Sequence, residues 1–216
     1  MDHSEVNLSI GFQCTTASVL KKINKRTNSF PFDWILSNPS SVLCLIKNVM
    51  ECKDIDEFVK KEFLNTDKFV KFIEPEEFII VENCTQNLLN SKYKLIFPHE
   101  NSNYNEVVEK YKRRFVRLKE IILNKDIKMN IYFIDRLGKN NYFKINDFNI
   151  LNNAEDSLNK LVNYMNNIRE KNKFYFILNK DSCININKLI KNSDVICIQI
   201  ISKNNMLTDE EIINHL

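Results

Sequence analysis

Glycine is scarce in this sequence: Gly11 and Gly138 are the only two in 216 residues. Phosphate-binding loops of the P-loop and dinucleotide-binding types need two or three glycines at short, fixed spacing, so both are excluded. The G-x-S-x-G elbow of serine hydrolases is also absent. Because glycine adopts positive φ at little cost, each of these two glycines is a candidate for a special backbone position.

Closely spaced cysteines are also lacking, although the chain has six cysteines. They stand far apart, at positions 14, 44, 52, 84, 183 and 197, and no C-x-x-C pair occurs. This spacing argues against a disulfide framework, a thioredoxin-like dithiol and a zinc site. We therefore expect reduced thiols, no metal site and no resident cofactor.

A large net charge and long apolar runs are missing too. The 31 basic and 28 acidic residues give a net charge of +3, too balanced to indicate nucleic-acid binding. No apolar run approaches the length of a membrane span, and the start MDHSEVNLSIGF does not resemble a signal peptide. We expect a cytoplasmic protein without nucleic-acid or membrane partners, whose oligomeric state stays open. Frequent Asn, Lys, Ile and Phe are typical of AT-rich genomes, including large DNA viruses, for which the location would be the host cytoplasm.

Short apolar segments alternate with amphipathic ones along the chain. The predicted strands are residues 6–11, 92–97, 129–134, 173–178 and 194–201, with an extended segment at 69–81. The predicted helices are residues 14–25, 41–51, 54–64, 104–124, 154–170 and the C-terminal TDEEIINHL. The later strands are continuous apolar runs, as in strands covered on both faces. The pattern predicts one domain over residues 1–216, of the α/β class, with a mostly parallel sheet flanked by helices in a three-layer, Rossmann-like arrangement.

Cys14 stands where the first strand gives way to the first helix, in the segment SIGFQC. A thiol at a helix start is near the positive end of the helix dipole, which favours the thiolate. The unpaired N–H groups there can hold an oxyanion. Cys14 is thus a candidate nucleophile, and the alternative is a small residue packed under a loop.

A cysteine nucleophile needs a base, and the sequence has three histidines. His3 is close to the terminus and His215 suits the end of a helix, which leaves His99, in FPHE after a predicted strand, as the credible partner. An acid would orient its imidazole. The candidate acids are Asp33, Glu100 and Asp135. Asp33 can equally be a turn-forming residue.

Three arginines, Arg113, Arg114 and Arg117, lie close together on the predicted helix 104–124. One interpretation is a clamp for a phosphate or carboxylate of a ligand. The other is a solvated helix flank.

Four motifs occur in order: G-x-x-C at 11–14, P-F-D-W-I at 31–35, F-x-H-E at 97–100, and a K-Y-x-R-R-x-x-R-L helix segment at 110–118. In order and spacing they resemble a bacterial and viral family of unknown function that is described as papain-like cysteine peptidases. The resemblance covers residues 7–123. Asn101 departs from it, because an aromatic residue usually follows the H-[DE] step.

The resemblance implies that Cys14 is the nucleophile and His99 its base. It brings Asp33, Trp34 and the arginine helix into the same neighbourhood. Asp33 is accordingly the third candidate catalytic residue. The candidate substrate-binding residues are Gly11, Gln13, Trp34, Glu100, Arg113, Arg114 and Arg117.

The leading hypothesis is a cysteine-dependent hydrolase that acts on a peptide, glycan or small-molecule substrate. SIGFQC is also similar to the G-N-C-Q step of capsular-polysaccharide biosynthesis proteins, with Phe12 in place of Asn, and that group is thought to transfer acyl groups with coenzyme A. The alternatives are therefore an acyltransferase that uses coenzyme A and a catalytically inactive interaction protein.

Overall fold

The structure, a computed structural model, describes residues 5–11, 14–66, 68–73, 77–80, 88–98, 103–137, 144–145, 148–149, 153–202 and 206–216. The helical elements are α1 (Thr15–Lys22), α2 (Pro39–Glu51), α3 (Ile55–Phe58), the π-helical turn η1 (Val59–Phe63), α4 (Tyr104–Leu123), α5 (Ala154–Ile168), the 3₁₀ turn η3 (Ile186–Lys188) and α6 (Asp209–Ile213). The strands are β1 (Glu5–Ser9), β2 (Lys68–Ile73), β3 (Glu77–Ile80), β4 (Leu88–Asn90), β5 (Leu95–Phe97), β6 (Lys128–Asp135), β7 (Lys144–Ile145), β8 (Phe148–Asn149), β9 (Asn172–Asn179) and β10 (Val195–Ile200).

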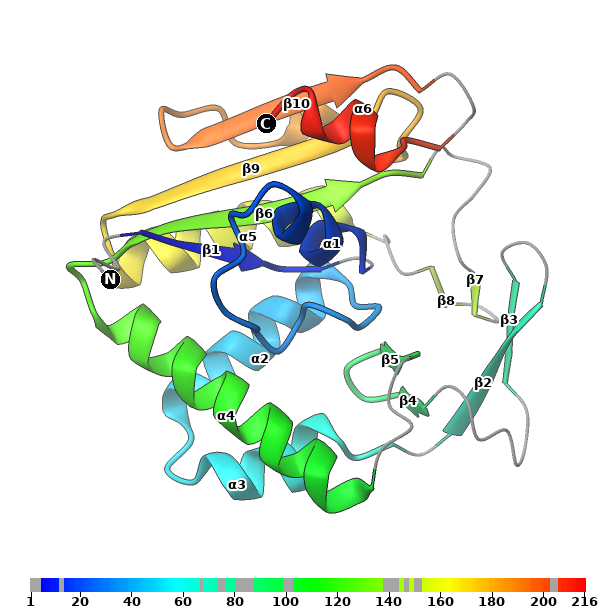
Figure 1. The fold of residues 1–216 in the computed structure, drawn as a ribbon, viewed down its shortest axis with the longest axis vertical. Coiled ribbons are helices and arrows are strands. Elements are labelled where there is room, and N and C mark those ends of the chain that lie inside the picture. Colours follow the sequence, from blue (N-terminus) through cyan, green and yellow to red (C-terminus); the bar gives the residue numbers. More distant parts are fainter. Residues whose placement is uncertain are drawn as a thin grey trace.

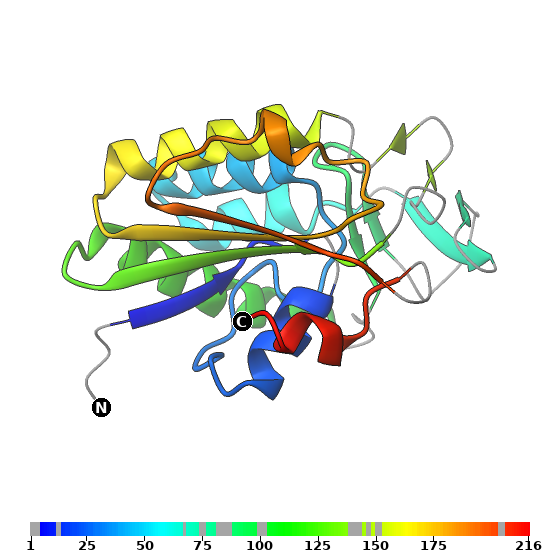
Figure 2. The same ribbon diagram turned by 90° about the horizontal axis from the view of Figure 1, so that it is seen from above.

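The main sheet contains four parallel strands in the order β1-β6-β9-β10. Helices α1 and α6 cover one of its faces, and α5 and α2 lie on the other (Figure 2). Helix α4 packs against α2 beyond the β1 edge (Figure 1). The predicted fold class, an α/β fold with a parallel sheet between helical layers, is confirmed.

The central strand β6 shows why this sheet is covered on both sides. Ile131 and Phe133 are buried in the large core that contains α2, α4 and α5. Ile134 is buried on the opposite face, in a smaller core with Val19 of α1 and Ile212 of α6. Successive side chains of a strand point to opposite faces, so a run that is apolar throughout fits a strand between two helical layers.

A second sheet, in the order β5-β4-β2-β3-β7-β8, lies beyond the carboxyl ends of the main strands (Figure 1). The extended segment predicted at 69–81 overlaps its antiparallel pair, β2 and β3. The strand predicted at 92–97 is shorter than expected, because residues 91–94 form a turn before β5. The sequence did not predict the separate sheet, and β4, β7 and β8 have only two or three residues each.

Aromatic side chains connect α4 to the rest of the large core. The ring of Phe115 on α4 makes edge contacts with Phe32, Phe58 and Phe63, at centroid distances of 6.2, 5.1 and 4.8 Å. Phe63 also contacts Phe97 of β5 at 5.3 Å. These contacts fix β5, η1 and the loop between α1 and α2 around one helix, and such edge-to-face pairs add to the stabilisation by burial.

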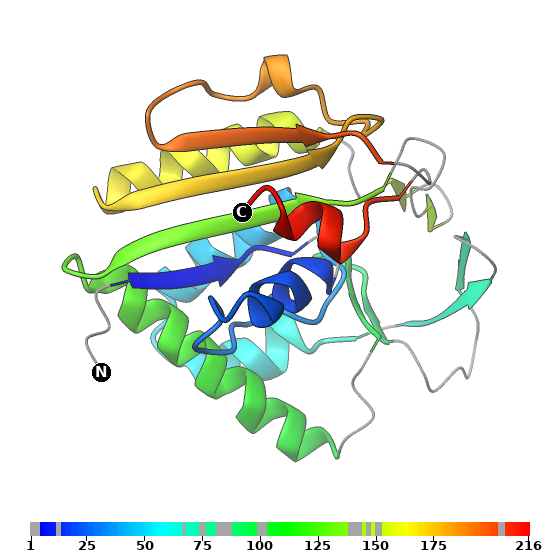
Figure 3. The ribbon, with the colours of Figure 1, turned by 45° about the horizontal axis from the view of Figure 1, so that its top comes forward.

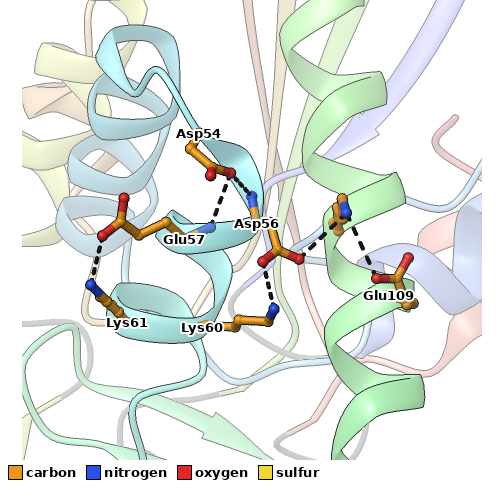
Figure 4. A network of polar contacts seen from close by, with 7 residues as sticks. Asp54, Asp56, Glu57, Lys60, Lys61 and Glu109 are labelled. Atoms are coloured by element: carbon orange, nitrogen blue, oxygen red, sulfur yellow. Dashed lines mark hydrogen bonds and ion pairs between the residues drawn. The ribbon is translucent and has the colours of Figure 1, made fainter.

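The outer surface of α3, η1 and α4 carries ion pairs instead (Figure 4). Lys60 and Lys61 pair with Asp56 and Glu57, one helical turn earlier, at 2.5 and 2.6 Å. Asp54 caps α3 by accepting hydrogen bonds from two backbone N–H groups. These contacts are largely exposed, so we assign them a small contribution to stability. Within the described ranges, no helix is both long and apolar enough to cross a membrane.

Candidate functional site

Cys14 precedes the first residue of α1, as the sequence predicted, and its backbone oxygen accepts the first helical hydrogen bond, from Ser18 N at 2.9 Å. The side chain is partly buried. Burial raises the pKa of the Cys14 thiol to about 11, against a smaller lowering by a backbone hydrogen bond. The expectation that the helix start would favour the thiolate is therefore wrong for this environment, because loss of solvation outweighs the favourable backbone contact.

Gly11 connects the end of β1 to the segment that leads to Cys14, and it has a φ of +37°. A Cβ atom on this residue would lie 2.5 Å from the backbone oxygen of Phe32. Its own carbonyl oxygen accepts a 2.7 Å hydrogen bond from Ser37 Oγ, which is buried. Glycine is needed here for both the backbone conformation and the close approach of the α1–α2 loop, which we define as residues 23–38.

The same loop also contacts β5. Leu36 and Ile96 exchange two backbone hydrogen bonds, of 2.9 and 3.0 Å, in an antiparallel bridge. Leu36 and Ser37 thus contact β5 at Ile96 and the residue Gly11 after β1. His99 and Glu100 follow Pro98 in the sequence and, like Gln13, lie outside the described residues.

Asp33 is almost completely buried within the α1–α2 loop. Its Oδ2 accepts hydrogen bonds from Arg26 Nε and Nη2, at 3.1 and 2.7 Å, and from Phe30 N at 2.8 Å. Burial raises the pKa of Asp33, whereas Arg26 and the Phe30 N–H lower it. Arg26 also stacks over the Trp34 ring, 5.5 Å from its centroid. Through these contacts Asp33 connects Arg26 and Phe30 and stabilises the conformation of the loop.

The three arginines of α4 have different environments. Arg117 Nη1 donates a 2.7 Å hydrogen bond to Ser29 O in the α1–α2 loop. Arg114 lies over the Tyr111 ring at 5.2 Å and is close enough to Asp33 to lower its pKa. Arg113 is exposed. Arg114 and Arg117 therefore face the α1–α2 loop, as the resemblance implied, and Arg113 does not belong to that cluster.

Asp135 ends β6 and is buried. Its Oδ2 accepts a 2.5 Å hydrogen bond from Ser182 Oγ, and its Oδ1 accepts one from Leu137 N. These contacts connect the carboxyl ends of β6 and β9. Across the part of the chain that is described, no group of three or more His, Cys, Asp or Glu residues is arranged to hold a metal ion.

Two arginines near the site were missed from the sequence. Arg26 binds Asp33, and its signal was its short separation from the P-F-D-W motif. Arg136 directly follows β6, and its Nη1 lies 3.4 Å from Oγ1 of Thr15, the residue after Cys14. Its signal was its place after a buried strand, since functional side chains gather at the carboxyl ends of parallel strands.

The chain belongs to the family described as "Putative papain-like cysteine peptidase (DUF1796)", whose model matches residues 5–176. This confirms the resemblance seen in the motifs. A curated relative is an uncharacterised protein of Acanthamoeba polyphaga mimivirus, 28% identical over 127 residues, or 54% of this chain and 56% of the relative. The chain thus spans about half the length of the curated relative it matches, and that relative is viral, as the resemblance allowed. No solved structure matches the chain.

Proposed function

We propose that this protein hydrolyses an acyl bond, with Cys14 as the nucleophile and His99 as its base. The observation that carries the proposal is the double contact of the α1–α2 loop. Ser37 binds Gly11, three residues before Cys14, and Leu36 pairs with Ile96, three residues before His99. The matching family supports the same chemistry at a coarse level.

In the proposed reaction the imidazole of His99 removes the thiol proton while Cys14 Sγ attacks the carbonyl carbon. The positive end of the α1 dipole, with the backbone N–H groups there, stabilises the oxyanion. The imidazolium then protonates the leaving amine or alcohol as the bond to the carbonyl carbon breaks. Water attacks the resulting thioester, and the carboxylic acid and the thiol are released.

In this proposal Asp33 and Arg26 are positioning residues. Their ion pair at 2.7 Å is shielded from solvent, with the two side chains 1% and 13% exposed. It holds the α1–α2 loop in the form that contacts both Gly11 and Ile96. Asp33 thus supports the reaction through the loop, even without contact with the imidazole.

p-Nitrophenyl acetate tests the proposal, because formation of an acyl-enzyme releases nitrophenolate and adds an acetyl group that mass spectrometry can map. We expect acetylation at Cys14, and a rate about a hundredfold or more lower in Cys14→Ser and His99→Ala. Cys44→Ser is the matched control, since Cys44 is an exposed thiol on α2. Full activity of Cys14→Ser would refute the assignment. Turnover of the acetyl-enzyme only with an added amine or hydroxyl compound would refute hydrolysis and favour the transferase.

A further inference from the structure

Arg136 makes a longer hydrogen bond than Arg26, Arg117 and Arg169, which like Arg136 are buried or partly buried. Arg26, Arg117 and Arg169 each donate at least one hydrogen bond of 2.8 Å or less to a carboxylate or a carbonyl oxygen. Arg136 donates one long hydrogen bond, of 3.4 Å, to Thr15 Oγ1. Its Nε is buried without a hydrogen-bond partner in the described part of the chain.

The carboxylate next to Arg136 forms a long ion pair with its guanidinium but no hydrogen bond. Oδ1 of Asp209, at the start of α6, lies 3.7 Å from Arg136 Nη1, beyond hydrogen-bond distance. The other oxygen of the same carboxylate accepts from Lys22 of α1 at 2.5 Å. Helices α1 and α6 lie side by side over this end of β6 (Figure 3). The group of Arg136, Lys22 and Asp209 therefore has one more positive charge than negative.

The backbone of Arg136 is firmly held although its side chain is not. Its carbonyl oxygen accepts hydrogen bonds from Leu207 N at 2.9 Å and from Asn179 Nδ2 at 3.1 Å. The side chain is 23% exposed, so it is not closed off from solvent. Arg114 also has one buried unpaired nitrogen, but its guanidinium is stacked on Tyr111.

We infer that Arg136 binds a carboxylate of the substrate beside Cys14, an inference that rests on the proposed function. A guanidinium presents parallel N–H groups that match the two oxygens of a carboxylate. Thr15 follows Cys14 in the sequence and accepts the hydrogen bond from Arg136, so a carboxylate bound by Arg136 would lie beside the start of α1. The substrate class is therefore an acyl compound that carries a carboxylate near the bond to be cleaved. Asp209 is a competing carboxylate, so a substrate carboxylate must bind Arg136 more strongly than Asp209 does.

Two alkylating reagents of similar size test this inference without knowledge of the substrate. Iodoacetate carries a carboxylate and iodoacetamide is neutral. The rate of alkylation of Cys14 by iodoacetate divided by its rate with iodoacetamide therefore reports recognition of the carboxylate. We expect Arg136→Gln to lower this ratio about tenfold, the low end of electrostatic guidance in a charged cleft. Arg136→Lys keeps the positive charge but loses the parallel N–H groups of the guanidinium. Its ratio should lie between those of the original protein and Arg136→Gln. Lys61→Gln removes a distant positive charge on η1 and should leave the ratio unchanged.

The complementary variant Asp209→Asn keeps Arg136 and removes the competing carboxylate, so it should raise the ratio. It also keeps the test decisive if Arg136→Gln does not fold. An unchanged ratio in Arg136→Gln, an equal fall in Lys61→Gln, or a fall in Asp209→Asn would overturn the inference. Failure of the proposed function has a different signature: slow release of nitrophenolate at Cys14, whatever the ratio of the alkylation rates.

Discussion

Replacing Gly11 with alanine tests whether the α1–α2 loop is held as closely to β1 as the structure indicates. The new Cβ would lie 2.5 Å from the backbone oxygen of Phe32, so the loop or the end of β1 must shift. The φ of +37° adds backbone strain for any residue with a side chain. That strain costs about 1–2 kcal/mol, and overpacking of this kind costs about 1–3 kcal/mol.

Together these two effects lower the free energy of unfolding by about 2–5 kcal/mol. For a chain of this length each kcal/mol corresponds to about 2–4 °C, so we expect Tm to fall by about 4–20 °C. Thermal and urea unfolding followed by circular dichroism measure both quantities. The rate of p-nitrophenyl acetate cleavage should fall as well, since a displaced loop alters the segment that leads to Cys14.

Ser37→Ala is the matched control, because it removes the hydroxyl that donates to Gly11 O and leaves the backbone unchanged. Alone it should cost about 1–2 kcal/mol, the usual effect of leaving a buried carbonyl unpaired. In the Gly11→Ala background it should cost less, by about 0.5 kcal/mol or more, since the loop has already moved. A Tm of Gly11→Ala within about 2 °C of the original protein, or strict additivity of the two changes, would refute the close contact.

Four further outcomes follow from other parts of the structure. Asp33→Asn leaves the Arg26 guanidinium buried without its partner and should lower the free energy of unfolding by about 3–5 kcal/mol; a urea-measured loss below about 1 kcal/mol would contradict the buried pair. In His99→Ala, alkylation of Cys14 by iodoacetamide should keep accelerating up to about pH 11, the pKa set by burial, and a plateau near pH 9 would contradict this. Because that pKa is raised, the stability due to the neutral thiol is present below pH 9 and lost toward pH 11, which urea unfolding across this range can follow. Lys61→Gln removes an exposed pair and should change stability by less than about 0.5 kcal/mol.

The two central strands of the main sheet could be predicted from the sequence because they are long and largely apolar. The predicted segments 129–134 and 173–178 lie within β6 and β9, each eight residues long. The second sheet could not be predicted in the same way. β7 and β8 have two residues each, too few to show any periodicity, and they pair with each other.

Helix boundaries show where local signals were present but incomplete. The helix predicted at 41–51 begins at Pro39, and Asn38 accepts a hydrogen bond from Ser41 N. This cap with proline at the first helical position is a recognised start signal that the prediction did not use. The helix predicted at 54–64 changes at Val59 from α to π hydrogen bonding. No sequence pattern marks that change.

Features of the candidate site that depend on one local stretch of sequence could be predicted, whereas those that depend on contacts between distant segments could not. The position of Cys14 at the start of α1 follows from the strand–turn–helix pattern around Gly11. The ionisation of its thiol depends on burial by segments that are distant in the sequence. The segment SIGFQC alone therefore gives no indication of it. The same holds for Arg136, whose neighbours Thr15 and Asp209 come from segments more than 70 residues away on either side.

The raised pKa of Cys14 distinguishes between two ways in which a cysteine and a histidine can work together. In the first, the two side chains form a thiolate–imidazolium pair before the substrate binds, which requires a thiol pKa below that of the imidazole. With the pKa at about 11, only about one thiol in ten thousand is ionised at pH 7. The second way, in which the base removes the proton during the attack, does not need a preformed thiolate. A thiol that burial keeps neutral fits the second way, in which a base removes the proton during the attack.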